Sequence, residues 1–170
     1  MSYNYSKSGF QEGYVGKKFR GGVCAGVVLG ALVFVSCASG PVHSQEKISG
    51  LIQAINSGRA ASMELNEAPF LFDGEILFLQ NQLGALWQNL YSAGFRLYSA
   101  KIVRNEAIGG DAYLEFGDTM DVRTFFQKYL DKDSSLVEIR ALSGSYVFLL
   151  GREVDGYPRI RGFKGGFLVK

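Results

Sequence analysis

The stretch from Asp118 to Leu150, DTMDVRTFFQKYLDKDSSLVEIRALSGSYVFLL, contains two different spacings of apolar residues. In its first part, apolar side chains recur every three or four residues, which is the spacing of a helix with one buried face. These residues are Val122, Phe125, Phe126, Tyr129 and Leu130. In its second part, apolar residues alternate with polar ones over 137–141 and then form the apolar run 146–150, as in strands. A helix followed by consecutive strands predicts a domain of the α+β class.

Polar residues and glycines mark the ends of these elements. The segment from Asp118 to Asp121 resembles a capping box, in which side chains satisfy the free N–H groups at a helix start. Ser143-Gly144-Ser145 and Asp155-Gly156 predict turns, and residues 158–169 predict a last pair of strands.

Two further helices are predicted before this stretch. Residues 48–55 share an apolar face at helical spacing, with Ser44 as a plausible N-cap and Gly58 at the end. A longer helix is predicted from Asp73, as its cap, to Gly94. Its polar face carries Gln and Asn but no Lys or Arg.

The remaining segments predict strands. Residues 61–72 alternate in part, and Pro69, which has no N–H to donate, assigns them to a sheet edge. Residues 96–104 and 112–116 flank Gly109-Gly110 and predict a hairpin. We therefore expect a mainly antiparallel sheet with about three helices packed on one of its faces.

Length and charge restrict the class of protein. About 125 residues follow Ser44, which is enough for one domain with a core and too few for two. We expect this single domain to occupy residues 45–170. From residue 38 onward the chain has 14 basic and 15 acidic residues. A nucleic-acid-binding domain would carry a basic excess, so nucleic acid is not an expected partner.

The N-terminal part has the pattern of an export signal. Residues 1–20 are polar and end in a basic cluster of Lys17, Lys18 and Arg20. The uncharged, mostly apolar run 21–36 follows, and Cys37 comes directly after it. Such a pattern directs the following residues across a membrane. A cysteine at this place is better explained by lipid attachment than by a disulfide, because no cysteine follows it.

The segment Phe34-Val35-Ser36-Cys37 resembles the lipobox of bacterial lipoprotein precursors, most closely the relaxed lipoboxes of spirochaetes. Ser36 and Cys37 fit the family pattern, whereas Phe34 replaces the usual Leu and Val35 is bulky for its position. The resemblance implies cleavage after residue 36, acylation of Cys37 and a short tether over residues 37–44. It also implies a place on the periplasmic face of the inner membrane or on the outer membrane.

Two other fates of this segment stay open. Ser36-Cys37-Ala38 also fits a small-x-small site for ordinary signal peptidase. The uncharged run from Gly21 to Gly40 is about long enough to remain as an uncleaved membrane anchor. All three fates export the domain.

Residues that carry common catalytic chemistry are scarce. His43, the single histidine, lies in the expected tether, which argues against His-dependent catalysis and a zinc site. Two carboxylate pairs, Asp73 with Glu75 and Asp118 with Asp121, are best interpreted as helix caps. We expect no catalytic residue, metal or cofactor.

Possible contact residues lie elsewhere. Arg159, Arg161 and Lys164 alternate with glycine and aromatic residues, which suits anionic lipid or a glycan; an edge strand protected by charges is the other interpretation. Trp87 lies on the apolar stripe of the predicted helix 73–94, which would pack on the sheet or insert into a membrane.

These observations favour a non-enzymatic interaction or assembly module of the cell envelope. It would be held to the membrane by a lipid anchor, with an envelope protein or lipid as its partner. The alternatives are a carrier of a hydrophobic ligand such as lipid, a membrane-inserting lipoprotein and a carboxylate-dependent enzyme. The oligomeric state stays open.

Overall fold

The fold is built on one six-stranded sheet. The computed structural model describes residues 42–62 and 64–165. The strands are β1 (Asn66–Phe72), β2 (Glu75–Leu77), β3 (Lys101–Ala107), β4 (Ser135–Ala141), β5 (Gly144–Val154) and β6 (Tyr157–Gly165). They lie in the order β2-β1-β6-β5-β4-β3, and all neighbours are antiparallel except β1 and β6, which are parallel. The predicted α+β class is confirmed.

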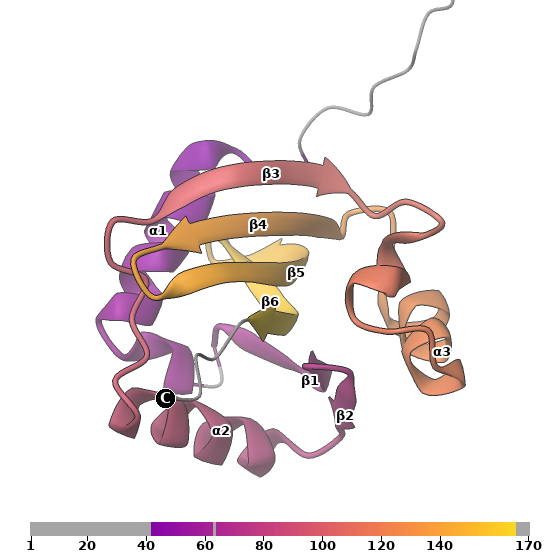
Figure 1. The fold of residues 1–170 in the computed structure, drawn as a ribbon, viewed down its shortest axis with the longest axis horizontal. Coiled ribbons are helices and arrows are strands. Elements are labelled where there is room, and N and C mark those ends of the chain that lie inside the picture. The colour runs from indigo at the N-terminus through magenta and orange to yellow at the C-terminus, as the bar shows by residue number, and fades with distance from the viewer. Residues whose placement is uncertain (1–41, 63, 166–170) are drawn as a thin grey trace, which may run out of the picture. The chain divides into compact units, whose positions relative to one another are not determined.

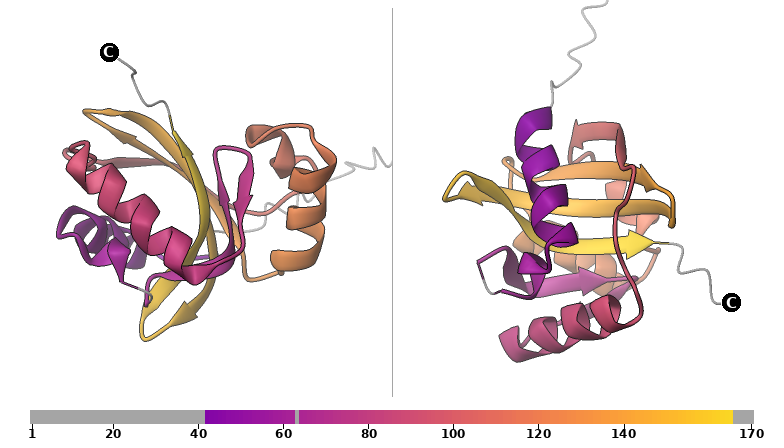
Figure 2. Two further views of the ribbon diagram at one scale, coloured as in Figure 1. Left: turned by 90° about the horizontal axis from the view of Figure 1, so that it is seen from below. Right: turned by 90° about the vertical axis from the view of Figure 1, so that its left-hand side faces the viewer.

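Helices cover both faces of this sheet (Figures 1 and 2). The helices α1 (Gln45–Asn56) and α2 (Gln80–Ser92) pack on one face, and α3 (Met120–Tyr129) packs on the other. The expectation that the helices share one face was therefore wrong. In β5, Phe148 faces α1 and α2 while Leu149 faces α3. A strand buried on both faces is a continuous apolar run, and residues 146–150 form such a run.

The larger of the two cores is aromatic and lies under α1 and α2. Phe163 of β6 is at its centre, with its ring centroid 5.3 Å from that of Trp87 and 5.4 Å from that of Phe148. The smaller core lies under α3 and consists of Leu71, Phe116, Val122, Phe125 and Leu149. The central strands are therefore fixed from both sides.

The caps of α1 and α3 follow from the sequence. Ser44 caps α1, where its Oγ accepts a hydrogen bond from the N–H of Lys47 at 3.4 Å. Gly58 follows the end of α1 with a φ of 84°, which suits glycine. Thr119 caps α3, where its Oγ1 accepts from the N–H of Val122 at 3.2 Å. Both predicted helices are confirmed.

The long helix predicted from Asp73 is shorter than expected. Asp73 and Gly74 form the tight turn between β1 and β2, with φ angles of 47° and 92°. Two central residues with positive φ match the twist of a two-stranded hairpin, and Asp-Gly is a preferred pair there. The helix α2 therefore begins only at Gln80, and Asp73 is a turn residue, not a helix cap.

The predicted strand with Pro69 is not at an edge. β1 lies between β2 and β6, although it starts only at Asn66. The register of β1 with β6 shifts between Asn66 and Leu71, and pairing with β2 starts at Phe70. Pro69 thus lies outside the regular ladders on both sides, where a missing N–H is tolerated.

One other predicted strand pair was wrong. Residues 112–115 form a short 3-10 helix, η2 (Ala112–Glu115), and β3 pairs with β4 instead. Of the last predicted pair, Tyr157 to Gly165 forms one strand, and residues 166–169 lie outside the described residues. The turn after β4 is at Leu142 and Ser143, one residue earlier than predicted.

Candidate functional site

Trp87 is part of the core and not of the surface. Its side chain is completely buried, and its indole N–H donates to Oδ1 of Asn66 at 2.8 Å. The amide nitrogen of Asn66 in turn donates to the carbonyl oxygens of Ala60 and Ser62. The only polar atom of the indole is therefore satisfied inside the core. The interpretation of Trp87 as a core residue is confirmed.

The three predicted basic contact residues lie on β6. Arg161 forms an ion pair with Glu67, with Nη1 and Oε1 3.1 Å apart, and donates to the carbonyl of Tyr129 at 2.5 Å. Arg161 thereby joins β6 to β1 and to the end of α3. Arg159 and Lys164 are half-buried on the same strand. The structure does not gather these residues into one site with Trp87, and Cys37 lies outside the described residues.

A surface groove of about 780 Å³ lies between the end of β3, the start of β4 and the segment that leads into η2. Its lining residues include four with charges and several small or apolar ones. They are Arg104, Glu106, Ala107, Gly109, Gly110, Asp111, Ala112, Leu114, Glu115 and Leu136. Sequence reasoning missed this groove because it assigned residues 112–116 to a strand. The charged residues suit a polar ligand or chain segment better than an acyl chain.

Arg104 is the centre of the charges in this groove. Its Nη2 lies 2.7 Å from Oε1 of Glu115, its Nη1 lies 3.5 Å from Oε1 of Glu106, and its Nε lies 3.9 Å from Oε2 of Glu138. The hydrogen bond to Glu115 is the main reason that the pKa of Arg104 is raised. The acidic side chains outnumber this single cation, so the groove is net negative.

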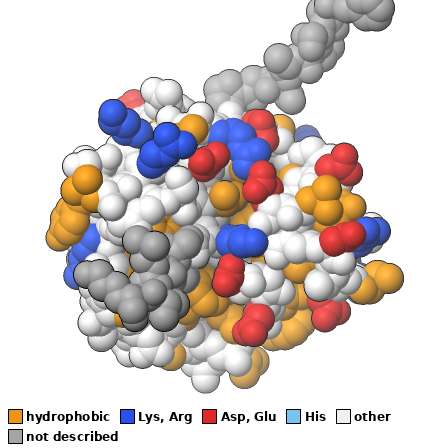
Figure 3. Space-filling model, viewed as in Figure 1, with side chains coloured by type: hydrophobic (Ala, Val, Ile, Leu, Met, Phe, Trp, Pro, Cys, Tyr) orange, Lys and Arg blue, Asp and Glu red, His pale blue; other side chains and the backbone are white. Residues whose placement is uncertain are grey.

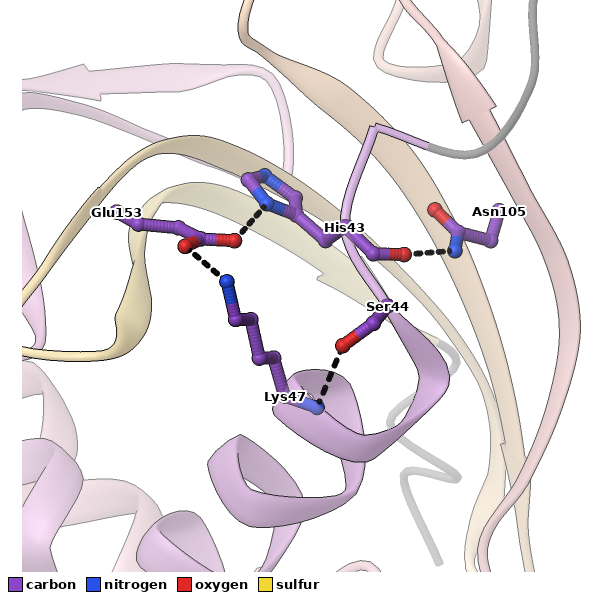
Figure 4. Close-up of polar contacts among 5 residues, drawn as sticks. All are labelled: His43, Ser44, Lys47, Asn105 and Glu153. Atoms are coloured by element: carbon purple, nitrogen blue, oxygen red, sulfur yellow. Dashed lines mark hydrogen bonds and ion pairs between the residues drawn. The ribbon is translucent and has the colours of Figure 1, made fainter.

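A second polar cluster fixes the first described residues of the chain to β5 (Figure 4). Nδ1 of His43 lies 3.1 Å from Oε1 of Glu153, and Lys47 Nζ donates to Oε2 of the same carboxylate. The carbonyl of His43 accepts from Nδ2 of Asn105 at 2.8 Å. The imidazole is 2% exposed. His43 therefore belongs to the domain, and its assignment to a tether was wrong.

The contacts of this cluster change the pKa of Glu153, and no sequence pattern predicts them. The hydrogen bond from Lys47 and, second, the contact with His43 lower the pKa of Glu153. Both partners favour the ionised carboxylate. Because Glu153 is 110 residues from His43 in the sequence, only the tertiary fold brings them together.

The predicted carboxylate pairs do not form a shared cleft. Asp73 and Glu75 are exposed in and after the β1–β2 turn. Asp118 accepts a hydrogen bond from Nε of Arg123 at 2.7 Å, and Asp121 is exposed in the first turn of α3. Within residues 42–62 and 64–165, no group of three or more His, Cys, Asp or Glu side chains could hold a metal ion. In the same ranges, no helix combines the length and the apolar character needed to cross a membrane.

Comparison of the chain with protein-family models, with curated proteins and with solved structures found no match.

Proposed function

We propose that this protein is a cell-envelope lipoprotein, anchored through an acylated Cys37, and that its domain is a non-enzymatic interaction module. The observation that carries the proposal is the short distance along the chain between Cys37 and the fold. His43, six residues after Cys37 in the chain, is fixed to the domain by Glu153 and Asn105. Six residues of extended chain reach at most about 22 Å. An acyl anchor on Cys37 would therefore hold the domain close to the membrane surface.

The groove around Arg104 supports the interaction module over a lipid carrier and over a carboxylate-dependent enzyme. A carrier for acyl chains needs a mostly apolar cavity, whereas this groove is open and carries four charged residues. A carboxylate enzyme needs two carboxylates that face a common substrate position. Glu106 and Glu115 of the groove instead pair with Arg104, which suits contact with a polar segment of a partner.

The anchor is tested by replacing each cysteine in cells grown with labelled palmitate. Cys37→Ala should abolish labelling and leave an unprocessed precursor. Cys24→Ala is the matched control, because Cys24 lies inside the apolar run and would leave with the signal. That variant should be labelled and processed like the parent. Unchanged labelling and processing of Cys37→Ala would refute the lipoprotein.

The interaction module is tested by a photo-crosslinking amino acid at position 114, which lines the groove and is exposed. In intact cells it should give discrete adducts with an envelope component, and Arg104→Glu should remove them. The control position is 88, which is exposed on α2. Equal adducts from both positions, or none from position 114, would contradict a partner at the groove.

A further inference from the structure

One end of the sheet presents exposed apolar side chains on a fixed backbone. There the segment before β3 meets the turn between β4 and β5, and the N–H of Leu142 donates to the carbonyl of Tyr98 at 3.0 Å. Ser143 Oγ donates to the carbonyl of Arg96 at 3.0 Å. Tyr98 is 60% exposed and Leu142 is 80% exposed. Two backbone segments thus hold a large aromatic and a large aliphatic side chain toward solvent.

Two exposed cations lie on the strands that adjoin this pair. Lys101 of β3 and Arg140 of β4 are direct cross-strand partners, and both are exposed. Like charges in such a pair destabilise a sheet. Neither side chain forms an ion pair or hydrogen bond with another described residue. Arg96 is not part of this group, because its half-buried guanidinium lies 4.7 Å from the ring of Tyr91 on α2. We call Tyr98, Lys101, Arg140 and Leu142 the cationic tip.

The two segments that form the cationic tip contain no acidic residue. The segments 93–105 and 139–152 contain no Asp or Glu. The exposed apolar residues Leu114 and Met120, by contrast, lie among Asp111, Glu115, Asp118 and Asp121. Figure 3 shows orange hydrophobic side chains at the left-hand end of the molecule with blue Lys and Arg side chains near them, and most red side chains lie toward the right. The two segments that form the cationic tip therefore carry only positive charges, in a domain that is nearly neutral.

We propose that the cationic tip binds the surface of an anionic lipid bilayer. Exposed cations next to an aromatic and an aliphatic side chain are the combination that suits the interface, where the cations meet phosphates and the apolar groups enter the headgroup region. Each Lys or Arg near such a surface strengthens binding by about fivefold. The inference rests on the proposed function in one respect, because the anchor on Cys37 would keep the tip within reach of the bilayer.

The contact is tested with the full chain carrying Leu142→Trp, reconstituted into vesicles with brominated acyl chains. The vesicles contain phosphatidylcholine alone or mixed with phosphatidylglycerol. The new tryptophan should be blue-shifted and quenched only with the anionic lipid, and high salt should reverse both changes. Trp87 gives a constant background because it is fully buried. Met120→Trp, at a position 77% exposed among acidic residues, should not respond.

Charge neutralisation separates lipid binding from simple apolar contact. In the Leu142→Trp protein, Lys101→Gln with Arg140→Gln should reduce the ratio of inserted to free tip by about 25-fold. Lys128→Gln with Lys132→Gln, which removes two exposed charges elsewhere, should leave the ratio unchanged. Equal quenching in neutral and anionic vesicles, no quenching in either, or an equal response at position 120 would overturn the proposal.

A Cys37→Ser variant of the Leu142→Trp protein distinguishes the two proposals. Quenching by added anionic vesicles that persists in this variant supports the cationic tip even if Cys37 proves not to be acylated. Loss of quenching at position 142 in a chain whose Cys37 is acylated overturns the cationic tip and leaves the lipoprotein proposal intact.

Discussion

At the scale of single residues, Gly162 shows how close two strands approach in this fold. It lies on β6 opposite Leu71 of β1, in the one parallel pair of the sheet. A Cβ at residue 162 would overlap the backbone carbonyl oxygen of Leu71. Backbone atoms in a sheet cannot move away as the end of a flexible side chain can. Glycine is therefore required by packing at this position.

We expect Gly162→Ala to lower the free energy of unfolding by about 1–3 kcal/mol, since the added methyl group overpacks a dense site. Gly84→Ala is the matched control. Gly84 lies inside α2, and no atom outside the neighbouring helix backbone lies within 4 Å of its Cβ position. Alanine there should raise the free energy of unfolding by about 0.5–1 kcal/mol. Urea unfolding of both variants measures the two changes, and a neutral Gly162→Ala would disprove the close approach.

At the scale of elements, α3 is a case in which the apolar pattern was sufficient to predict the helix. Its stripe, its cap and its acidic first turn all specify the same helix, and the structure has that helix at Met120–Tyr129. Residues 73–79 show the opposite case. Ile76 and Leu79 continue the helical spacing of α2, but Asp73-Gly74 makes a tight turn and the chain pairs as β2. A few apolar residues fit the spacing of a helix as well as that of a strand. Pairing with β1 therefore decided that residues 75–77 form a strand.

Shortening a buried side chain on the apolar face of α3 should lower the free energy of unfolding. Phe125 is fully buried against Leu71 and Leu149 in the core under α3. We expect Phe125→Ala to lower the free energy of unfolding by about 3–5 kcal/mol through lost burial and the cavity that remains. Met120→Ala, on the exposed side of the same helix, should change it by less than about 0.5 kcal/mol. Chemical denaturation measures both, and a loss below about 1 kcal/mol for Phe125→Ala would mean that this face is exposed.

At the scale of the whole molecule, Glu153 connects the end of β5 to the first described residues. Because its pKa is lowered in the fold, Glu153 stabilises the folded state above the carboxylate's unfolded pKa. That contribution is lost as the pH falls through the lower, folded pKa. We therefore expect the free energy of unfolding to decrease more from neutral to acidic pH in the parent than in Glu153→Gln.

The difference should be no more than about 1 kcal/mol, since the Lys47–Glu153 pair is partly exposed. Glu46→Gln is the control, because Glu46 is exposed on the same helix as Lys47 and forms no ion pair with a described residue. Its pH dependence should match the parent. Identical pH profiles for the parent and Glu153→Gln would show that this contact does not stabilise the fold.

The sequence by itself determined the class of the fold, the helices α1 and α3 and most of the central strands. Each of these depends on local spacing, caps or turn residues, which a chain segment carries with it. The tertiary structure alone decided the parallel pairing of β1 with β6, the position of α3 on the second face and the groove around Arg104. It also decided the contacts that bury His43. Each of these joins segments that are far apart in the chain, so that its energy depends on contacts that exist only once the sheet has formed.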